Sequence, residues 1–189
     1  MLIVDSFELR NKDYLKEQIL EHGHRDQTRT SIKIDNLLGG NIYHPHHEHE
    51  RYGKELPLHW SLAKADFERK LKNLTHENCE IVDMWAIGYD GGQGCRPHNH
   101  RRNTYGAIYY LYGDVDAGNL EFPHKGITIQ PKENRFVIFS GEWSHQVEPS
   151  IADEIDRVCI AMNVDVEGWI TPKGKTVEGW ITPEGRNEK

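Results

Sequence analysis

Between residues 80 and 164 the sequence is a succession of short segments rich in β-branched and aromatic residues, each followed by turn residues. These segments cover residues 80–89, 105–112, 119–122, 126–130, 135–140 and 157–164. Several short strands at nearly regular spacing are typical of an all-β barrel or sandwich. We therefore predict a β core for this part of the chain.

Two helices are predicted ahead of the β core. Apolar residues recur at helical spacing over residues 9–22 and again from about 58 to 74, with charged residues on the opposite face. In the first helix the predicted apolar face consists of Leu9, Tyr14, Leu15, Ile19 and Leu20. Residues 24–57 are polar and interrupted by glycine and proline, which is typical of a loop, with one short strand predicted at 32–34. The result is an α+β fold with helices packed on one face of the β core.

The chain is expected to form one domain with a tail. Its 189 residues can bury a sizeable core without disulfides. Residues 1–78 are predicted to be a helical support and loop region, residues 79–165 the catalytic β core, and residues 166–189 a tail. The tail holds two 11-residue repeats, VEGWITPKGKT and VEGWITPEGRN, which are too few for a solenoid. We expect it to be exposed, with its tryptophans packed on the barrel or on another subunit.

Charge, hydropathy and cysteine content argue against several classes of protein. Thirty acidic and 23 basic residues give a net charge of -7, which argues against a protein that coats nucleic acid or an anionic membrane. The apolar runs are too short for a membrane-spanning helix, and the first four apolar residues lead directly to a carboxylate, unlike a signal peptide. The three cysteines lack a CxxC spacing and fit a reducing compartment. We therefore expect a cytoplasmic protein without nucleic-acid or membrane partners.

A group of histidines and one arginine gives the first indication of chemistry. His98 and His100 are two residues apart, so on a strand both side chains point the same way. His145 follows segment 135–140 in a glycine-initiated turn, where a neighbouring strand can carry it to the same point. Three imidazoles suit Fe, Cu, Ni or Zn, and a triad on one face of the metal leaves positions open for oxygen. Arg157, 12 residues after His145, offers an inward-facing bidentate partner for a carboxylate.

Other polar groups are open to more than one interpretation. The histidine-rich residues 44–49 have a proline and polar flanks, which indicate an exposed loop; a lid over the pocket and loose metal binding are the alternatives. Alternation along segment 105–112 places Tyr110 and Tyr112 on one face of the strand. Asn163 lies on the same face as Arg157 by the same rule, either as a core polar group or as a pocket residue.

At these residues the chain resembles the 2-oxoglutarate- and iron(II)-dependent dioxygenases, in particular the small prolyl-hydroxylase-like proteins of bacteria and phages. His98-Asn99-His100 occupies the place of that family's HxD or HxE pair. GAIYYLYGDVDAGNLEF is similar to the strand pair that follows it, VIFSGEWSHQVEPS to the segment around the distal histidine, and Arg157 to the 2-oxoglutarate binder. The likeness spans residues 80–164. It implies a double-stranded β-helix, a jelly-roll or cupin-like barrel, with N-terminal supporting helices.

The resemblance also implies a site and a reaction. Fe(II) would bind at His98, His100 and His145, with 2-oxoglutarate as co-substrate chelating the metal and its far carboxylate on Arg157. O2 would take the remaining position. Tyr110, Tyr112 and Asn163 are further candidates for the co-substrate pocket. The implied activity is that of an oxidoreductase that hydroxylates a C–H bond of an unidentified small-molecule or peptide substrate and releases succinate and CO2.

One residue departs from the family pattern, and two other functions fit part of the sequence. Where the family has a carboxylate, this chain has His100, and three neutral histidines leave a metal more positively charged. A cupin-type three-histidine iron dioxygenase without 2-oxoglutarate would match Gly92 followed by the HxH pair. It would not match Pro149, which stands where that motif has an asparagine. A non-enzymatic β-barrel binding module, with the HxH pair vestigial or holding zinc, is the third hypothesis.

Overall fold

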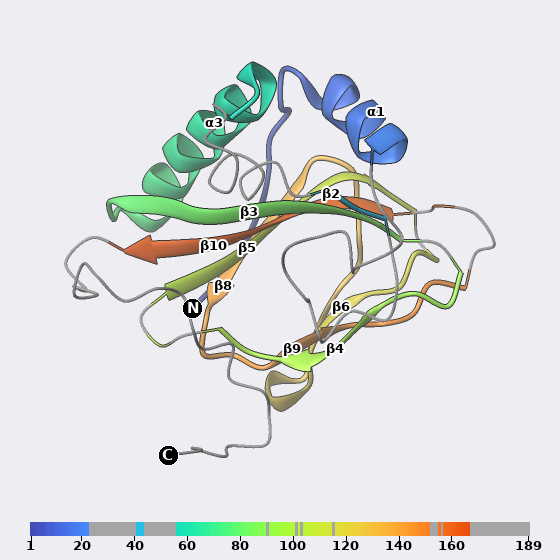
Figure 1. Cartoon of the computed structure of the whole chain (residues 1–189). Helices are drawn as coiled ribbons and strands as arrows, with labels where there is room; N and C mark the ends of the chain where they lie inside the picture. Colours follow the sequence, from blue (N-terminus) through green and yellow to red (C-terminus); the bar gives the residue numbers. More distant parts are fainter. Residues whose placement is uncertain are drawn as a thin grey trace, which may run out of the picture.

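The computed structural model describes residues 1–22, 41–43, 56–89, 91–100, 102, 104–114, 116–151, 155 and 157–166. These residues form three layers (Figure 1): two helices, a six-stranded sheet and a four-stranded sheet. Helices α1 (Lys12–His22) and α3 (Leu58–Thr75) cover the outer face of the larger sheet. The predicted arrangement of helices on one face of a β core is therefore confirmed.

Neighbouring strands in both sheets are antiparallel. The larger sheet has the order β1 (Leu2–Ser6), β8 (Arg135–Ser140), β5 (Thr104–Gly113), β10 (Arg157–Val166), β3 (Cys79–Tyr89) and β2 (Asn41–Tyr43). The smaller sheet has the order β4 (Cys95–His98), β9 (His145–Val147), β6 (Leu120–Phe122) and β7 (Ile127–Ile129). A 3-10 helix, η2 (Pro123–Lys125), joins β6 to β7. From β3 to β10 the chain thus passes repeatedly between the two sheets.

The first core lies between the helices and the larger sheet. Leu15 and Ile19 of α1 and Phe67 of α3 are fully buried there, against Tyr109 and Phe136 of the sheet, among others. Alternation along the strands separates this core from a second one between the two sheets. The second core includes Trp85, Ile87 and Tyr89 of β3, Phe139 of β8 and Phe122 of β6. The space between the sheets is where the candidate site lies.

The beginning of the chain differs from the sequence prediction. Strand β1, which was not predicted, pairs with β8 over its whole length. Helix α1 begins at Lys12, and Leu9 is buried ahead of it, where its N–H donates to the hydroxyl of Tyr109 at 3.3 Å. Tyr14 and Leu20 are 42% and 39% exposed, so the prediction that they share the buried face is wrong. Each adjoins Leu15 or Ile19 in sequence, and a step of one residue turns a helix side chain by about 100°.

Each of the six segments predicted from residues 80 to 164 contains a described strand, although β6 and β7 begin one residue later than predicted and β7 ends one residue earlier. The strand predicted at 32–34, the histidine-rich residues 44–49 and the repeats beyond Val166 lie outside the described residues. Cys79, Cys95 and Cys159 are free thiols. Neither α1 nor α3, the helices in the described part of the chain, is both long and apolar enough to cross a membrane.

Candidate metal centre

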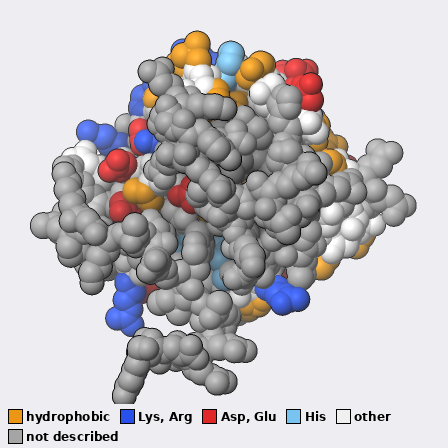
Figure 2. Space-filling model, viewed as in Figure 1, with side chains coloured by type: hydrophobic (Ala, Val, Ile, Leu, Met, Phe, Trp, Pro, Cys, Tyr) orange, Lys and Arg blue, Asp and Glu red, His pale blue; other side chains and the backbone are white. Residues whose placement is uncertain are grey.

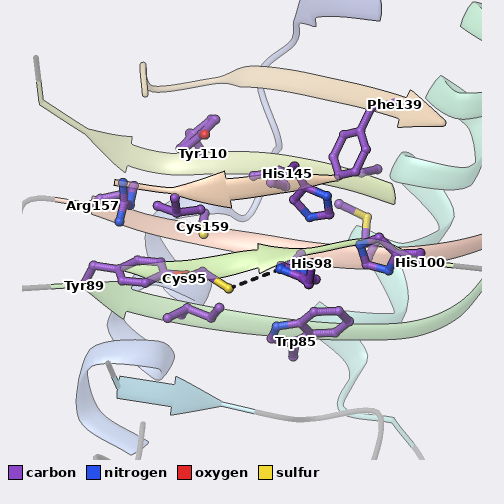
Figure 3. Close-up of a pocket in the computed structure, with 16 residues that line it drawn as sticks. Trp85, Tyr89, Cys95, His98, His100, Tyr110, Phe139, His145, Arg157 and Cys159 are labelled. Atoms are coloured by element: carbon purple, nitrogen blue, oxygen red, sulfur yellow. Dashed lines mark hydrogen bonds between the residues drawn. The ribbon is translucent and has the colours of Figure 1, made fainter. Parts of the chain in front are cut away.

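A cavity of about 50 Å³ lies between the two sheets. Its walls are mostly apolar and aromatic, with Trp85, Ile108 and Phe139 among them. Three histidines lie at one end and Arg157 at the other (Figure 3). In the space-filling view, histidine is visible in a hollow near the centre of one face (Figure 2). An apolar pocket with a few convergent polar groups is the usual form of a small-molecule site.

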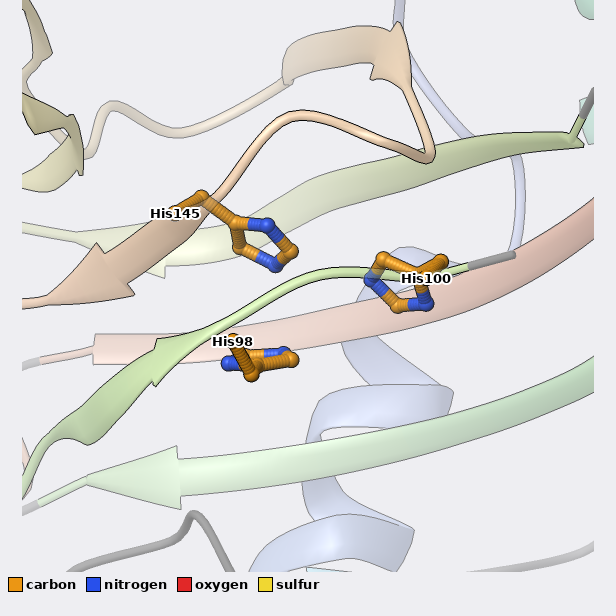
Figure 4. A group of neighbouring side chains, drawn as sticks. All are labelled: His98, His100 and His145. Carbon is orange, nitrogen blue, oxygen red and sulfur yellow. The ribbon is translucent and has the colours of Figure 1, made fainter. Parts of the chain in front are cut away.

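His98, His100 and His145 converge on one point (Figure 4). His98 ends β4 and pairs across the sheet with His145, the first residue of β9, so that their ring centroids are 4.2 Å apart. His100 lies just beyond β4, where its N–H donates to the Gly141 carbonyl at 2.6 Å. One ligand atom from each histidine lies within 4.8 Å of the other two. The predicted convergence is confirmed, and the three side chains form a candidate metal-binding triad.

Backbone carbonyls orient two of the three imidazoles. His98 Nδ1 lies 2.9 Å from the carbonyl oxygen of Arg96, and His145 Nδ1 lies 3.1 Å from that of Trp143. Because a carbonyl oxygen can only accept, each Nδ1 carries the hydrogen and each Nε2 keeps its lone pair for a metal. Cys95 Sγ also lies near His98 Nδ1, at 3.6 Å. It therefore approaches the nitrogen that faces the carbonyl, which does not favour a role as a fourth ligand.

The triad is electrically neutral at pH 7. Burial lowers the pKa of His98. It lowers the pKa of His100 to about 4, with a further contribution from the neighbouring His98. Burial also lowers the pKa of His145 well below its ordinary value. Neutral imidazole is the form that binds a metal, so protons do not compete strongly for these three sites.

Arg157 lies at the opposite end of the cavity and is 1% exposed. Its guanidinium stacks over the Tyr89 ring, 4.1 Å from the centroid, and its Nη1 donates to the Gly118 carbonyl at 2.5 Å. Nε and Nη2 are buried and have no hydrogen-bond partner among the described residues. Hydrogens on Nε and Nη2 form one edge of the guanidinium fork, which matches the two oxygens of a carboxylate. The prediction that Arg157 faces inward is confirmed.

The residues present fit both a metal and an acid. Three neutral imidazole nitrogens suit Fe, Ni, Cu or Zn, and the free edge of Arg157 suits a carboxylate. Burying a guanidinium with two unpaired nitrogens costs free energy unless those nitrogens bind an anion or another acceptor. An anion in the cavity would offset this cost.

The two tyrosines predicted to share a face do not. Tyr110 lines the cavity and is 2% exposed. Tyr112 instead packs against the core beneath the helices, where Lys16 of α1 lies 4.4 Å from its ring centroid. The prediction for Tyr112 is wrong because β5 contains a β-bulge: Tyr110 pairs with Cys159 and Tyr112 with Val158, which leaves Leu111 as an extra residue. A bulge reverses the alternation beyond it.

Asn163 and Tyr89 complete the polar surroundings. Asn163, on β10, lies near His100 and opposes the lowering of its pKa. Tyr89, beneath Arg157, was not singled out from the sequence. Alternation from Trp85 and Ile87 along the predicted strand would have placed it in the cavity. Its contact with Arg157 follows from the pairing of β3 with β10, which the sequence does not reveal.

Comparisons with known proteins give structural neighbours but no sequence relatives. No family model matches the chain, and no curated protein matches its sequence. A viral collagen prolyl hydroxylase from Paramecium Bursaria Chlorella virus-1, solved as a 2-oxoglutarate complex, has a TM-score of 0.60 and 14% identity over 86% of this chain and 94% of its own. A Pseudomonas putida prolyl-4-hydroxylase has a TM-score of 0.57 and 17% identity over 87% and 91%.

A third neighbour has a different kind of ligand. HygX from Streptomyces hygroscopicus, with nickel, 2-oxoglutarate and hygromycin B bound, has a TM-score of 0.61 and 8% identity over 87% of this chain and 82% of its own. At such low identity the likeness concerns the fold. The chain thus shares the fold of prolyl hydroxylases and other 2-oxoglutarate-dependent enzymes, and its three histidines form a candidate metal-binding triad within that fold.

Proposed function

We propose that this protein is an iron(II)- and 2-oxoglutarate-dependent dioxygenase. The observation that carries the proposal is that one cavity has a different kind of binding group at each of its two ends. Three neutral imidazoles converge at one end, and a buried guanidinium with a free fork edge lies at the other. A diacid that chelates a metal through one end and binds an arginine through the other fits this arrangement.

The topology supports the same proposal. The passage of the chain between two facing antiparallel sheets, from β3 through β10, is the strand order expected of a double-stranded β-helix. The supporting helices α1 and α3 cover the larger sheet. His98 and His145 lie on paired strands of the smaller sheet and Arg157 on a strand of the larger one, and all three line one cavity. This supports the proposed roles of metal ligand and acid binder.

Each residue has a distinct task in the proposed reaction. His98, His100 and His145 hold iron, and Arg157 binds the far carboxylate of 2-oxoglutarate. Burial raises the pKa of Tyr110, so its hydroxyl keeps its proton and can donate to the co-substrate. The apolar walls exclude water. Iron with 2-oxoglutarate supplies the chemistry: O2 is consumed, 2-oxoglutarate becomes succinate and CO2, and a C–H bond of the substrate is hydroxylated.

The prime substrate is proposed at the level of class. Among the structural neighbours, one is a collagen prolyl hydroxylase and one holds hygromycin B, so both peptides and small molecules are candidates here. The three free cysteines favour a reducing compartment, and we propose a cytoplasmic site of action.

One observation favours a second candidate function. The third member of the triad is His100 where the family pattern has a carboxylate, and a three-histidine site is the pattern of cupin-type iron dioxygenases that do without 2-oxoglutarate. The free edge of Arg157 suits the far carboxylate of 2-oxoglutarate, whereas the second candidate would pair it only if the substrate itself carries a carboxylate.

Conversion of 2-oxoglutarate to succinate tests the proposal. Iron-loaded protein is incubated with 2-oxoglutarate and O2, and succinate is measured against a free-iron control. We expect slow succinate formation without any prime substrate, its loss in His98→Ala, and its retention in His124→Ala, which changes an exposed histidine of η2. No succinate above the free-iron control, together with no binding of 2-oxoglutarate, would contradict the proposal.

A further inference from the structure

Arg157 owes its orientation to one contact with a neighbouring segment. Its Nη1 donates to the Gly118 carbonyl at 2.5 Å, which leaves the edge formed by Nε and Nη2 unpaired among the described residues. Tyr89 lies beside the guanidinium (Figure 3), with its ring centroid 4.1 Å from Cζ, but a ring offers no directed acceptor for a particular N–H. The position of the Gly118 carbonyl therefore decides which edge of Arg157 is free.

Glu148 holds the Gly118 segment in place. Its carboxylate accepts from the Asn119 N–H at 3.1 Å and from Asn119 Nδ2 at 2.7 Å, both through Oε2. Its own N–H donates to the Asn119 carbonyl at 2.9 Å. We call these three hydrogen bonds between Glu148 and Asn119 the clasp. It joins the end of β9 to the segment that precedes β6, next to the carbonyl that Arg157 uses.

The clasp leaves very little space at Gly118. This glycine has a φ of +73°, and an added Cβ would overlap the Glu148 carbonyl oxygen and lie 3.2 Å from Arg157 Nη1. Gly118 is therefore packed between the two residues, and a shift of Glu148 is transmitted directly to its carbonyl. Glu148 is itself held from the other side, because Ser150 pairs with Gln93 and Gly92 through backbone hydrogen bonds.

Glu148 is ionised, and the positive charge of Arg157 contributes to this. The hydrogen bonds from Asn119 lower the pKa of Glu148, and the charge of Arg157 adds a smaller lowering. Glu121 lies in the same network, within hydrogen-bonding reach of Glu148 and paired with Gln146 at 2.6 Å. Because the two charges interact, the Glu148 carboxylate would by charge alone weaken the binding of an anion to Arg157. Its presence at this position therefore calls for another role.

We propose that Glu148 is a positioning residue for co-substrate binding: through its clasp on Asn119 it keeps the Gly118 carbonyl on Nη1, so that Nε and Nη2 of Arg157 face the cavity. The inference rests on the proposed function, because it assigns the free edge to the far carboxylate of 2-oxoglutarate. It adds Glu148, Asn119 and Gly118 to the residues that determine affinity for that acid.

Two substitutions at one position separate positioning from charge. Glu148→Ala removes the two side-chain hydrogen bonds of the clasp and the negative charge together, and leaves the backbone hydrogen bond from Glu148 N–H to the Asn119 carbonyl. We expect the Kd for 2-oxoglutarate to rise about tenfold, the effect of losing roughly one well-placed hydrogen bond. Glu148→Gln keeps an acceptor oxygen for Asn119, and its amide can donate to Glu121. We expect its Kd to equal the wild-type value or fall below it. If Glu148 acted only through its charge, both variants would bind 2-oxoglutarate more tightly.

The experiment is calorimetric titration of the Mn(II)-loaded full chain with 2-oxoglutarate, anaerobically, beside a separate titration with Mn(II) alone. Asn119→Ala removes the bond from Asn119 Nδ2 to Glu148 Oε2, which is the shorter of the two bonds to the carboxylate, and takes the place of Glu148→Ala if that variant does not fold. Glu142→Ala, an exposed glutamate near His145, is the matched control. The expected result is weaker 2-oxoglutarate binding in Glu148→Ala and Asn119→Ala, with metal affinity unchanged in both and wild-type behaviour in Glu142→Ala.

Three results would overturn the inference. These are wild-type 2-oxoglutarate affinity in both clasp variants, equal losses of metal and 2-oxoglutarate affinity, or a Glu148→Gln variant as weak as Glu148→Ala. A wild-type protein that binds Mn(II) but no 2-oxoglutarate would instead reject the proposed function, and the inference with it. Failure of the inference about Glu148 can be distinguished from failure of the proposed function, because the wild-type protein is measured first.

Discussion

Replacing Arg157 by methionine should remove 2-oxoglutarate binding while leaving the metal site intact. Two guanidinium nitrogens, Nε and Nη2, are available to the co-substrate carboxylate, and each charge-assisted hydrogen bond contributes about 1.5–3 kcal/mol. Their loss together amounts to about 3–6 kcal/mol, which is roughly a 150- to 20,000-fold increase in Kd. Methionine is chosen because it fills much of the arginine's volume with an apolar chain.

The same substitution should not destabilise the metal-free protein. Arg157 is buried with two unpaired nitrogens among the described residues, and replacing such a charge by an apolar group is often neutral or stabilising. An arginine that serves only to hold the fold together would behave in the opposite way. The free energy of unfolding, from urea denaturation of the metal-free protein, should therefore equal or exceed the wild-type value.

Calorimetric titration measures the two affinities separately. Mn(II) is titrated first and 2-oxoglutarate second, anaerobically, for wild type, Arg157→Met and Arg102→Met, which changes an exposed arginine. We expect unchanged Mn(II) affinity in both variants and loss of 2-oxoglutarate affinity in Arg157→Met alone. A Kd for 2-oxoglutarate within about threefold of wild type, or a parallel loss of Mn(II) binding, would refute this reasoning.

Three further outcomes are expected. His100→Asp should retain iron and form succinate at an equal or higher rate, because a carboxylate offsets the metal charge; complete loss of iron in a metal analysis would show that the imidazole is required. The free energy of unfolding of the metal-free protein should fall as pH drops from 6.5 toward about 4, because the folded state keeps His100 neutral where the unfolded chain takes up a proton, by at most about 1.4 kcal/mol per pH unit. In urea denaturation across this range, a slope that is the same in wild type and in His100→Asn would contradict the assignment. Tyr110→Phe should raise the Kd for 2-oxoglutarate about fivefold, whereas Tyr112→Phe, on the other face of β5, should leave it unchanged; equal effects in the same titration would contradict the placement of Tyr110.

Much of the site could be predicted from the alternation of side chains along single strands. His98 and His100 are close enough in sequence for alternation to fix their relative direction, and the same rule relates Asn163 to Arg157. The convergence of His145 with this pair depends on the pairing of β4 with β9, which the glycine-initiated turn suggested. The relation between Arg157 and Asn163 is not disturbed by the bulge at this place, because the extra residue, Leu111, is in β5 and the alternation along β10 continues.

The failures have equally local causes. The position of Tyr112 depends on a bulge at Leu111, which is created by the register of β5 against β10. The first turn of the predicted helix is absent because Leu9 is fixed by the hydroxyl of Tyr109, a hundred residues away. The clasp of Glu148 on Asn119 likewise joins segments that are distant in sequence. The face on which Tyr112 lies, the start of α1 and the clasp all depend on contacts between segments that are distant in sequence. The periodicity of a single segment cannot predict such contacts.

Anaerobic addition of Fe(II) to the metal-free protein, with and without 2-oxoglutarate, tests the central claim most directly. The visible spectrum is recorded for wild type, His145→Ala and His124→Ala. We expect a weak charge-transfer band that appears in wild type only when both iron and 2-oxoglutarate are present, persists in His124→Ala and is lost in His145→Ala. Iron binding to the triad without any spectral response to 2-oxoglutarate would contradict the claim and favour a three-histidine dioxygenase that does not use this acid.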